Sequence, residues 1–255
     1  ESDDQYFEPF KGLEWARFDG KTHAAPVMWS DYPMNYREDM LSDLPDSWTD
    51  LGDEKYRGRL VTLDDSANLW VMARALFGTS DFSSLTKRNV DEVVEAFRPI
   101  KKNLVTISPS YGDIVDILAR GDAAASVLGW RFVEMQLKKK GYPGASHLPE
   151  EGTFLWCDSY CLASKAPHLD AAYAFVDQML SPKANAIIAA GTGSGVVNAQ
   201  AVAHLPSEQQ ALYPYGSIDS FLAKNQFYTA PKLEAESPVA TMRDWIDAWE
   251  RVKLS

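Results

Sequence analysis

The sequence contains few of the residues that build covalent or metal-bound sites. Only two cysteines occur among 255 residues, Cys157 and Cys161, and the four histidines are scattered without the spacing of metal ligands. On one extended strand the two cysteines are about 13 Å apart, beyond the roughly 7 Å between Cα atoms that a disulfide spans. We therefore expect no disulfide between them, no metal site and no cofactor.

Motifs of catalytic nucleophiles are also missing. There is no serine in a glycine elbow, no His-Glu-x-x-His and no cysteine with a partnered histidine. The glycine run 191–195 follows a predicted helix rather than a strand, so it indicates a helix C-cap and not a phosphate loop. We expect a protein that is not an enzyme, and a periplasmic hydrolase is the disfavoured alternative.

Charge and hydropathy exclude two further classes. A net charge of -11 argues against a nucleic-acid partner, which needs a basic face. No apolar run reaches the roughly 18 to 20 residues that span a bilayer. The acidic opening, residues 1–4, has neither an initiator methionine nor a cleavable leader.

The stretch 154–161 is the most informative feature that is present. Side chains alternate along a strand, so Trp156, Asp158 and Tyr160 are expected on one face. An indole face attracts a small cation and a carboxylate neutralises it. The alternative is a buried strand whose Asp158 caps a turn, and the strand taken alone favours that alternative.

Strands and helices alternate along the chain, which predicts an α/β protein with largely parallel strand pairing. Asp64 and Asp65 lie at a strand-to-helix junction, where they either cap the helix or face a ligand at the carboxyl edge of a sheet. The predicted strands are 21–29, 59–63, 104–107, 123–128 and 154–161, and the predicted helices are 64–78, 91–97, 111–121, 169–180, 183–190, 206–214, 217–224 and 239–252.

Short signatures in a fixed order extend from about residue 20 to the C-terminus. They are Gly20-Lys21-Thr22, Pro26-Val27-Met28-Trp29, Ser47-Trp48-Thr49-Asp50-Leu51, Tyr56-Arg57-Gly58, Thr62-Leu63-Asp64-Asp65, Gly121-Asp122, Leu128-Gly129-Trp130, Glu151-Gly152, Trp156-Cys157-Asp158-Ser159, and Gly193 with Asn198. In this order and spacing the chain resembles the periplasmic spermidine/putrescine-binding proteins, the solute-binding components of ABC importers.

The resemblance implies a two-lobed periplasmic-binding-protein fold of type II, with the ligand in the cleft between the lobes. It places 1–29 and 157–204 in a partial first lobe, and 30–156 and 205–255 in the second lobe. The family's first lobe begins with a strand-helix-strand segment that has no counterpart in this sequence. We therefore expect a processed, truncated or incompletely recorded binding protein.

The resemblance also implies a set of ligand-binding residues. The aromatic and the acid of the family's crossing strand match Trp156 and Asp158, and its first helix acid matches Asp65. Other positions match with changes: the second acid falls on Asn68, a cleft tyrosine on Ser194, a tryptophan on Trp130 after a one-residue shift, and a C-terminal glutamine near Tyr228.

These residues suit a small amine. A polyamine needs a carboxylate near each ammonium, and Asp158 and Asp65 supply two, but Asn68 weakens the case for a long polyamine. Arg131 either holds a ligand carboxylate, which favours an ω-amino acid, or makes a surface ion pair.

The resemblance implies a periplasmic, monomeric protein whose lobes close on the ligand and whose closed form a membrane permease recognises. A sensor or interaction module on the same fold is the alternative.

Overall fold

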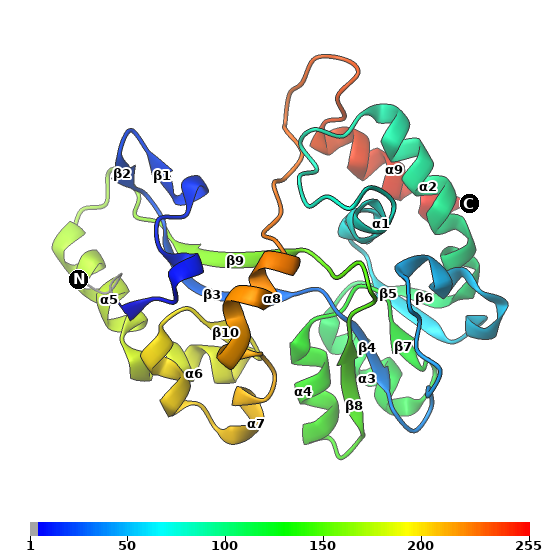
Figure 1. The fold of residues 1–255 in the computed structure, drawn as a ribbon, viewed down its shortest axis with the longest axis horizontal. Helices are drawn as coiled ribbons and strands as arrows, with labels where there is room; N and C mark the ends of the chain where they lie inside the picture. Colours follow the sequence, from blue (N-terminus) through cyan, green and yellow to red (C-terminus); the bar gives the residue numbers. More distant parts are fainter. Residues whose placement is uncertain (1–4) are drawn as a thin grey trace. The chain divides into compact units, whose positions relative to one another are not determined.

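The chain folds into two units, each built from separated stretches of sequence (Figure 1). The computed structural model describes residues 5–255. Unit 1 contains residues up to Ser30 and Leu155–Asn225, and unit 2 contains Asp31–Phe154 and Gln226–Ser255. The stretch 205–225, which the resemblance assigned to the second lobe, thus lies in unit 1, because Leu205 joins its buried cluster and Tyr213 packs on Trp29.

Unit 1 has a small sheet, a two-stranded ribbon and several helices. Their bounds are β1 (Arg17–Phe18), β2 (Lys21–Thr22), β3 (Ala25–Asp31, whose last residue belongs to unit 2), β9 (Leu155–Tyr160), α5 (Leu169–Leu180), α6 (Pro182–Thr192), β10 (Gly195–Val196), α7 (Ser207–Gln210) and α8 (Ile218–Lys224).

Unit 2 is larger and combines a five-stranded sheet with long helices. Their bounds are β4 (Met34–Arg37), β5 (Leu60–Leu63), α1 (Ala67–Phe77), α2 (Lys87–Asn103), β6 (Leu104–Ser108), α3 (Tyr111–Arg120), β7 (Ala125–Ser126), α4 (Arg131–Lys139), β8 (Gly144–His147) and α9 (Met242–Leu254).

The sheet of unit 2 is mixed, with the strand order β6-β5-β7-β4-β8. β5 pairs in parallel with β6 and β7, whereas β4 is antiparallel to β7 and β8. Parallel pairing needs a crossover connection, which here is helical and links β5 to β6 and β6 to β7. The prediction of largely parallel pairing is therefore correct for these three strands and wrong for β4 and β8.

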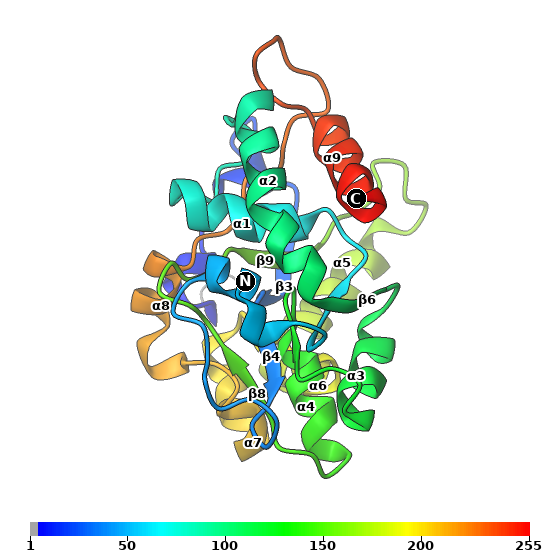
Figure 2. The same cartoon turned by 90° about the vertical axis from the view of Figure 1, so that its right-hand side faces the viewer.

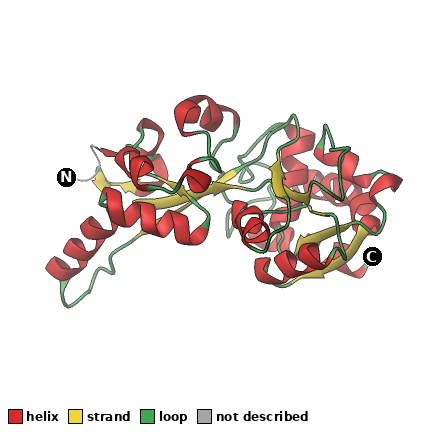
Figure 3. Cartoon of the chain, turned by 90° about the horizontal axis from the view of Figure 1, so that it is seen from below, coloured by secondary structure: helices red, strands yellow, loops and turns green. Residues whose placement is uncertain are grey.

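Helices cover both faces of this sheet, as Figure 3 shows for the strands drawn in yellow. Leu60 and Val61 of β5 point to opposite faces because side chains alternate along a strand. Leu60 joins a buried cluster with α1, α2 and α9, and Val61 joins a second cluster with α3 and α4. In Figure 2, α2 and α9 lie side by side, in agreement with their contacts.

Two long helices of unit 2 begin with capping boxes. Thr86 and Asn89 cap each other at the start of α2, four residues before the predicted start at residue 91. Thr241 and Asp244 do the same for α9. The tryptophans of α9, predicted one turn apart on the same face, are both buried at Trp245 and Trp249.

The sheet of unit 1 has the order β10-β3-β9, with β10 antiparallel to β3. Trp29 of β3 is fully buried, and its indole N–H donates to the carbonyl of Val196 at 3.1 Å. A Cβ on Gly195 would lie 2.5 Å from the Trp29 ring, so only glycine fits there. α6 ends at Gly193 with φ 67°, which confirms the predicted helix C-cap.

Helix α5 of unit 1 buries little of its own surface. Leu180 is its buried residue, whereas Tyr173 and Phe175 are 64% and 55% exposed. No helix found between residues 5 and 255 is long and apolar enough to cross a bilayer.

Candidate functional site

Three neighbouring strands of unit 2 end at one edge of the sheet with polar or aromatic residues. Asp65 follows β5, Tyr111 follows β6 and Trp130 follows β7. These strands run in parallel with β5 in the middle, so their carboxyl ends meet at the same edge. In open α/β sheets this edge is where ligands bind.

Asp65 is exposed at this edge. One oxygen of its carboxylate accepts a hydrogen bond from the backbone N–H of Ala67 at 2.8 Å, so Asp65 also supports the start of α1. Its neighbour Asp64 accepts from the indole N–H of Trp249 at 2.8 Å and lies 3.0 Å from the ammonium of Lys253. The Trp249 hydrogen bond, followed by Lys253, lowers the pKa of Asp64. Asp64 therefore ties α9 to the sheet, whereas Asp65 makes no ion pair with the described residues.

Asn68 lies beneath Asp65 and is fully buried. Its amide nitrogen donates to the carbonyls of Leu63 and Asp65, both at 2.8 Å, and its amide oxygen accepts from the hydroxyl of Thr62. The side chain thus fixes the turn between β5 and α1. At this position the structure has a turn-forming amide rather than a second exposed acid.

Trp130 is half-buried between two other rings. Its ring centroid lies 5.5 Å from that of Tyr111 and 5.0 Å from that of Phe132. The backbone N–H of Trp130 donates to the side chain of the buried Asn35 at 2.9 Å. The indole is therefore fixed by packing and by a backbone hydrogen bond.

Tyr111 was not among the predicted site residues. Burial raises the pKa of its phenol well above the usual value, and Tyr32 and the carboxylate of Asp65 raise it further. The sequence did contain a signal for it, because Tyr111 follows the predicted strand 104–107 just as Asp65 follows 59–63.

Arg131 uses its guanidinium fork within unit 2. Its Nε and Nη2 donate to the two carboxylate oxygens of Asp31 at 2.8 and 2.7 Å. Asp31 is fully buried and the Arg131 side chain is 14% exposed. Of the two alternatives for Arg131, the structure has the ion pair, but buried rather than on the surface.

Tyr228 packs into an aromatic cluster. Its ring lies 5.2 Å from Trp70 and 5.7 Å from Phe154, measured between centroids. It is half-buried against the main core of unit 2.

The remaining predicted residues lie in unit 1. Trp156 is half-buried on β9, and Asp158 on the same strand is exposed. Partial withdrawal of its carboxyl group from water raises the pKa of Asp158. Its carboxylate makes no hydrogen bond or ion pair with the residues that the structure describes, so a turn-capping role finds no support. Ser194 is buried, and its hydroxyl has no hydrogen-bond partner within the described part of the chain.

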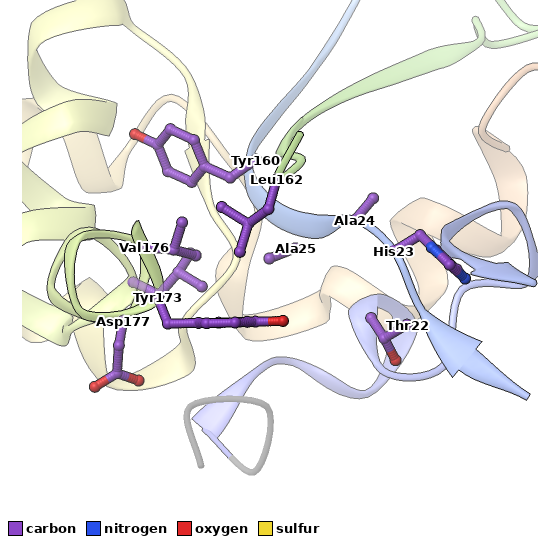
Figure 4. Close-up of a pocket in the computed structure, with 10 residues that line it drawn as sticks. Thr22, His23, Ala24, Ala25, Tyr160, Leu162, Tyr173, Val176 and Asp177 are labelled. Carbon is purple, nitrogen blue, oxygen red and sulfur yellow. The ribbon is translucent and has the colours of Figure 1, made fainter. Parts of the chain in front are cut away.

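Unit 1 also contains a pocket of about 360 Å³ between β9, α5 and the start of β3 (Figure 4). Tyr160, Leu162, Tyr173 and Val176 contribute much of its wall. In Figure 4 the carboxylate of Asp177 points away from Thr22 and the other residues on the opposite wall. Among the described residues that line the pocket, Asp177 is the one acid.

The described residues include no group of three or more His, Cys, Asp or Glu side chains that could hold a metal ion. Cys157 and Cys161 are both free thiols.

Comparisons with known proteins agree on one family. Residues 2–214 match the model of the bacterial extracellular solute-binding proteins. The chain is 23% identical over 197 residues to the spermidine/putrescine-binding periplasmic protein of Escherichia coli K12, a match that covers 75% of this chain and 55% of that protein. It is 26% identical over 251 residues to the putrescine/agmatine-binding protein of Pseudomonas aeruginosa. That match covers 92% of this chain and 66% of the relative.

A solved structure matches as well. The substrate-binding protein of a spermidine/putrescine ABC transporter from Streptococcus pneumoniae superposes with a TM-score of 0.81 at 19% identity, over 100% of this chain and 75% of that one. The match shows a two-lobed α/β fold, and the chain spans about half the length of the curated E. coli relative. The chain belongs to the family of bacterial extracellular solute-binding proteins.

Proposed function

We propose that this protein captures a small amine of the polyamine class in the periplasm and delivers it to the permease of an ABC importer. The observation that carries the proposal is the edge of β6-β5-β7, where the exposed carboxylate of Asp65 lies near Tyr111, whose ring packs against Trp130. A carboxylate and aromatic faces together favour an ammonium ion.

The state of Arg131 favours an amine over a zwitterion. An ω-amino acid requires a cation that accepts its carboxylate, and Arg131 was the candidate. The carboxylate of Asp31 accepts hydrogen bonds from two nitrogens of that guanidinium and neutralises its charge. The ligand that this edge suits is therefore a diamine rather than an ω-amino acid.

Unit 1 supplies a second aromatic residue and a second acid. Trp156 and Asp158 lie on one strand, and the Asp158 carboxylate has no cationic partner among residues 5–255. We propose that Asp158 of unit 1 and Asp65 of unit 2 are each able to neutralise an ammonium. The named relatives bind spermidine, putrescine or agmatine, which are amines of this kind.

Isothermal titration calorimetry with putrescine, spermidine and 4-aminobutyrate tests the proposal. We expect the two polyamines to bind more tightly than 4-aminobutyrate. Asp158→Asn should weaken putrescine binding roughly 10- to 100-fold, since hydrogen bonds to charged groups contribute about 1.5–3 kcal/mol. Asp65→Asn should weaken it less, because Asp65 also serves the start of α1.

Asp43→Asn is the matched control, because it removes an exposed acid whose partner is Lys55. Equal small effects of Asp158→Asn and Asp65→Asn would contradict the assignment of the site. Tighter binding of 4-aminobutyrate than of putrescine would contradict the ligand class.

A further inference from the structure

Tyr111 lies where the parallel strands bring the proposed amine site together. β6 and β5 pair with Leu63 opposite Ser108, and the backbone N–H of Asp64 donates to the carbonyl of Ser108 at 2.7 Å. This hydrogen bond brings the ends of the two strands into register. The residues that follow, Asp65 just before α1 and Tyr111 at the start of α3, therefore lie at adjacent positions on the same edge.

The orientation of Tyr111 is fixed on its other side by β7. Its ring packs edge-on to Trp130 at 5.5 Å between centroids, with an interplanar angle of 65°. Its hydroxyl lies 3.4 Å from the carbonyl of Gly129, a long hydrogen bond to the residue before Trp130. Tyr111 thus lies near Asp65, which follows β5, and packs against Trp130, which follows β7.

Gly129 shows how closely this edge is packed. A Cβ at Gly129 would lie 2.3 Å from the carbonyl oxygen of Pro33 and close to the side chain of Asn35. The backbone that receives the Tyr111 hydroxyl therefore has no room to shift. The ring of Tyr111 is half-buried against this edge.

We infer that Tyr111 is a further ligand-binding residue, whose ring binds the ammonium or the adjoining methylene groups of the amine at Asp65. The inference rests on the proposed function. A phenol ring with a carboxylate nearby attracts a cation through its face, while the carboxylate balances the charge. The hydroxyl, engaged by Gly129, holds the ring and does not bind the ligand.

Calorimetric titration of putrescine into the full chain and three variants tests the inference. Tyr111→Phe keeps the ring and should bind within about threefold of the wild type. Tyr111→Leu keeps an apolar side chain without a π face and should bind about tenfold more weakly, the range of a cation–π contact. Tyr142→Leu, on an exposed tyrosine of the same unit, is the control and should bind as the wild type.

The outcomes separate the two proposals. If the wild type binds putrescine and Tyr111→Leu binds it equally well, the role of Tyr111 is overturned while the amine site stands. If Tyr111→Phe binds putrescine as weakly as Tyr111→Leu does, the hydroxyl contributes to binding and the assignment to the ring is overturned. If the wild type binds no putrescine or spermidine, the proposed function fails and the role of Tyr111 fails with it. Thermal unfolding of each variant distinguishes lost binding from lost folding.

Discussion

Both carboxylate oxygens of the buried Asp31 accept hydrogen bonds from the guanidinium of Arg131, a residue 100 positions further along the chain. The pair joins the end of β3 to the first residue of α4. It therefore orients the helix that begins immediately after Trp130, and it cancels the cation at this edge of unit 2.

Replacing Asp31 by asparagine should destabilise the protein. Removing one member of a buried ion pair leaves the other charge without its partner, which costs about 3 kcal/mol. Urea denaturation of Asp31→Asn measures this loss as a lower midpoint. Asp43→Asn, which breaks the exposed pair with Lys55, should leave the midpoint nearly unchanged. Equal midpoints for the two variants would contradict the stabilising role of the Asp31 pair.

Asp158 should make amine binding depend on pH. Its pKa is raised in the folded protein because its carboxyl group is partly withdrawn from water. As the pH falls through this raised pKa, the carboxylate takes up a proton and loses its attraction for an ammonium. Putrescine affinity should therefore fall on acidification, as measured by calorimetry between pH 7 and pH 4.

The same shift has an effect on stability of the opposite sign. Between the pKa of the unfolded chain and the raised pKa of the fold, the folded protein binds more protons at Asp158. The contribution of Asp158 to stability therefore decreases as the pH rises through this window. Asp158→Asn should reduce both pH dependences, and a variant that retains them in full would show that other groups cause them.

Restoring an acid at position 68 should harm the fold and not improve binding. Asn68→Asp removes both side-chain donors to the carbonyls of Leu63 and Asp65 and buries a carboxylate. Both carbonyls keep a backbone N–H donor, so the cost comes from the carboxylate buried in place of the amide and is about 1–3 kcal/mol or more. Thermal unfolding should show a lower midpoint, and calorimetry should show no gain in spermidine affinity. A gain in affinity without loss of stability would mean that position 68 faces the ligand.

The two thiols should differ in reactivity. Burial, with a smaller effect of Asp158, raises the pKa of Cys157 to about 12, whereas Cys161 is exposed. Because the thiolate is the reactive form, Cys161 should react with a maleimide at pH 7 and Cys157 should not. Peptide mass spectrometry after brief labelling locates the adduct. Cys161→Ser should abolish rapid labelling, and labelling that persists in this variant would contradict the burial of Cys157.

Local patterns were sufficient to predict several elements of the fold. The strand 59–63, the helix that follows the Asp65 turn, and the C-cap at Gly193 were all found from local signals. The strand predicted at 123–128 shrinks to Ala125–Ser126, since apolar residues on both sides are buried without belonging to a ladder. The strand predicted at 21–29 divides into β2 and β3.

The candidate residues came from the family resemblance, Trp130 only after a one-residue shift. The strand-to-helix junction at Asp65, taken alone, favoured a helix cap. The buried partner of Arg131 lies 100 residues away, and the three hydrogen bonds of Asn68 depend on the turn that it stabilises. Tyr111 was missed because its position matters only once β6 is placed beside β5.

Unit 2 cannot complete its core in the order in which the polypeptide is made. Trp249 of α9 packs against Phe97 of α2 at 5.7 Å between ring centroids, and Trp245 fills the same cluster. Residues 155–225 of unit 1 are translated between these two parts. From the end of α2 to the start of α9 the ribosome makes residues 104–241, which takes roughly 7–28 s, and during this time the apolar face of α2 has no α9 to cover it. The core of unit 2 is therefore completed only after all of unit 1 has been synthesised.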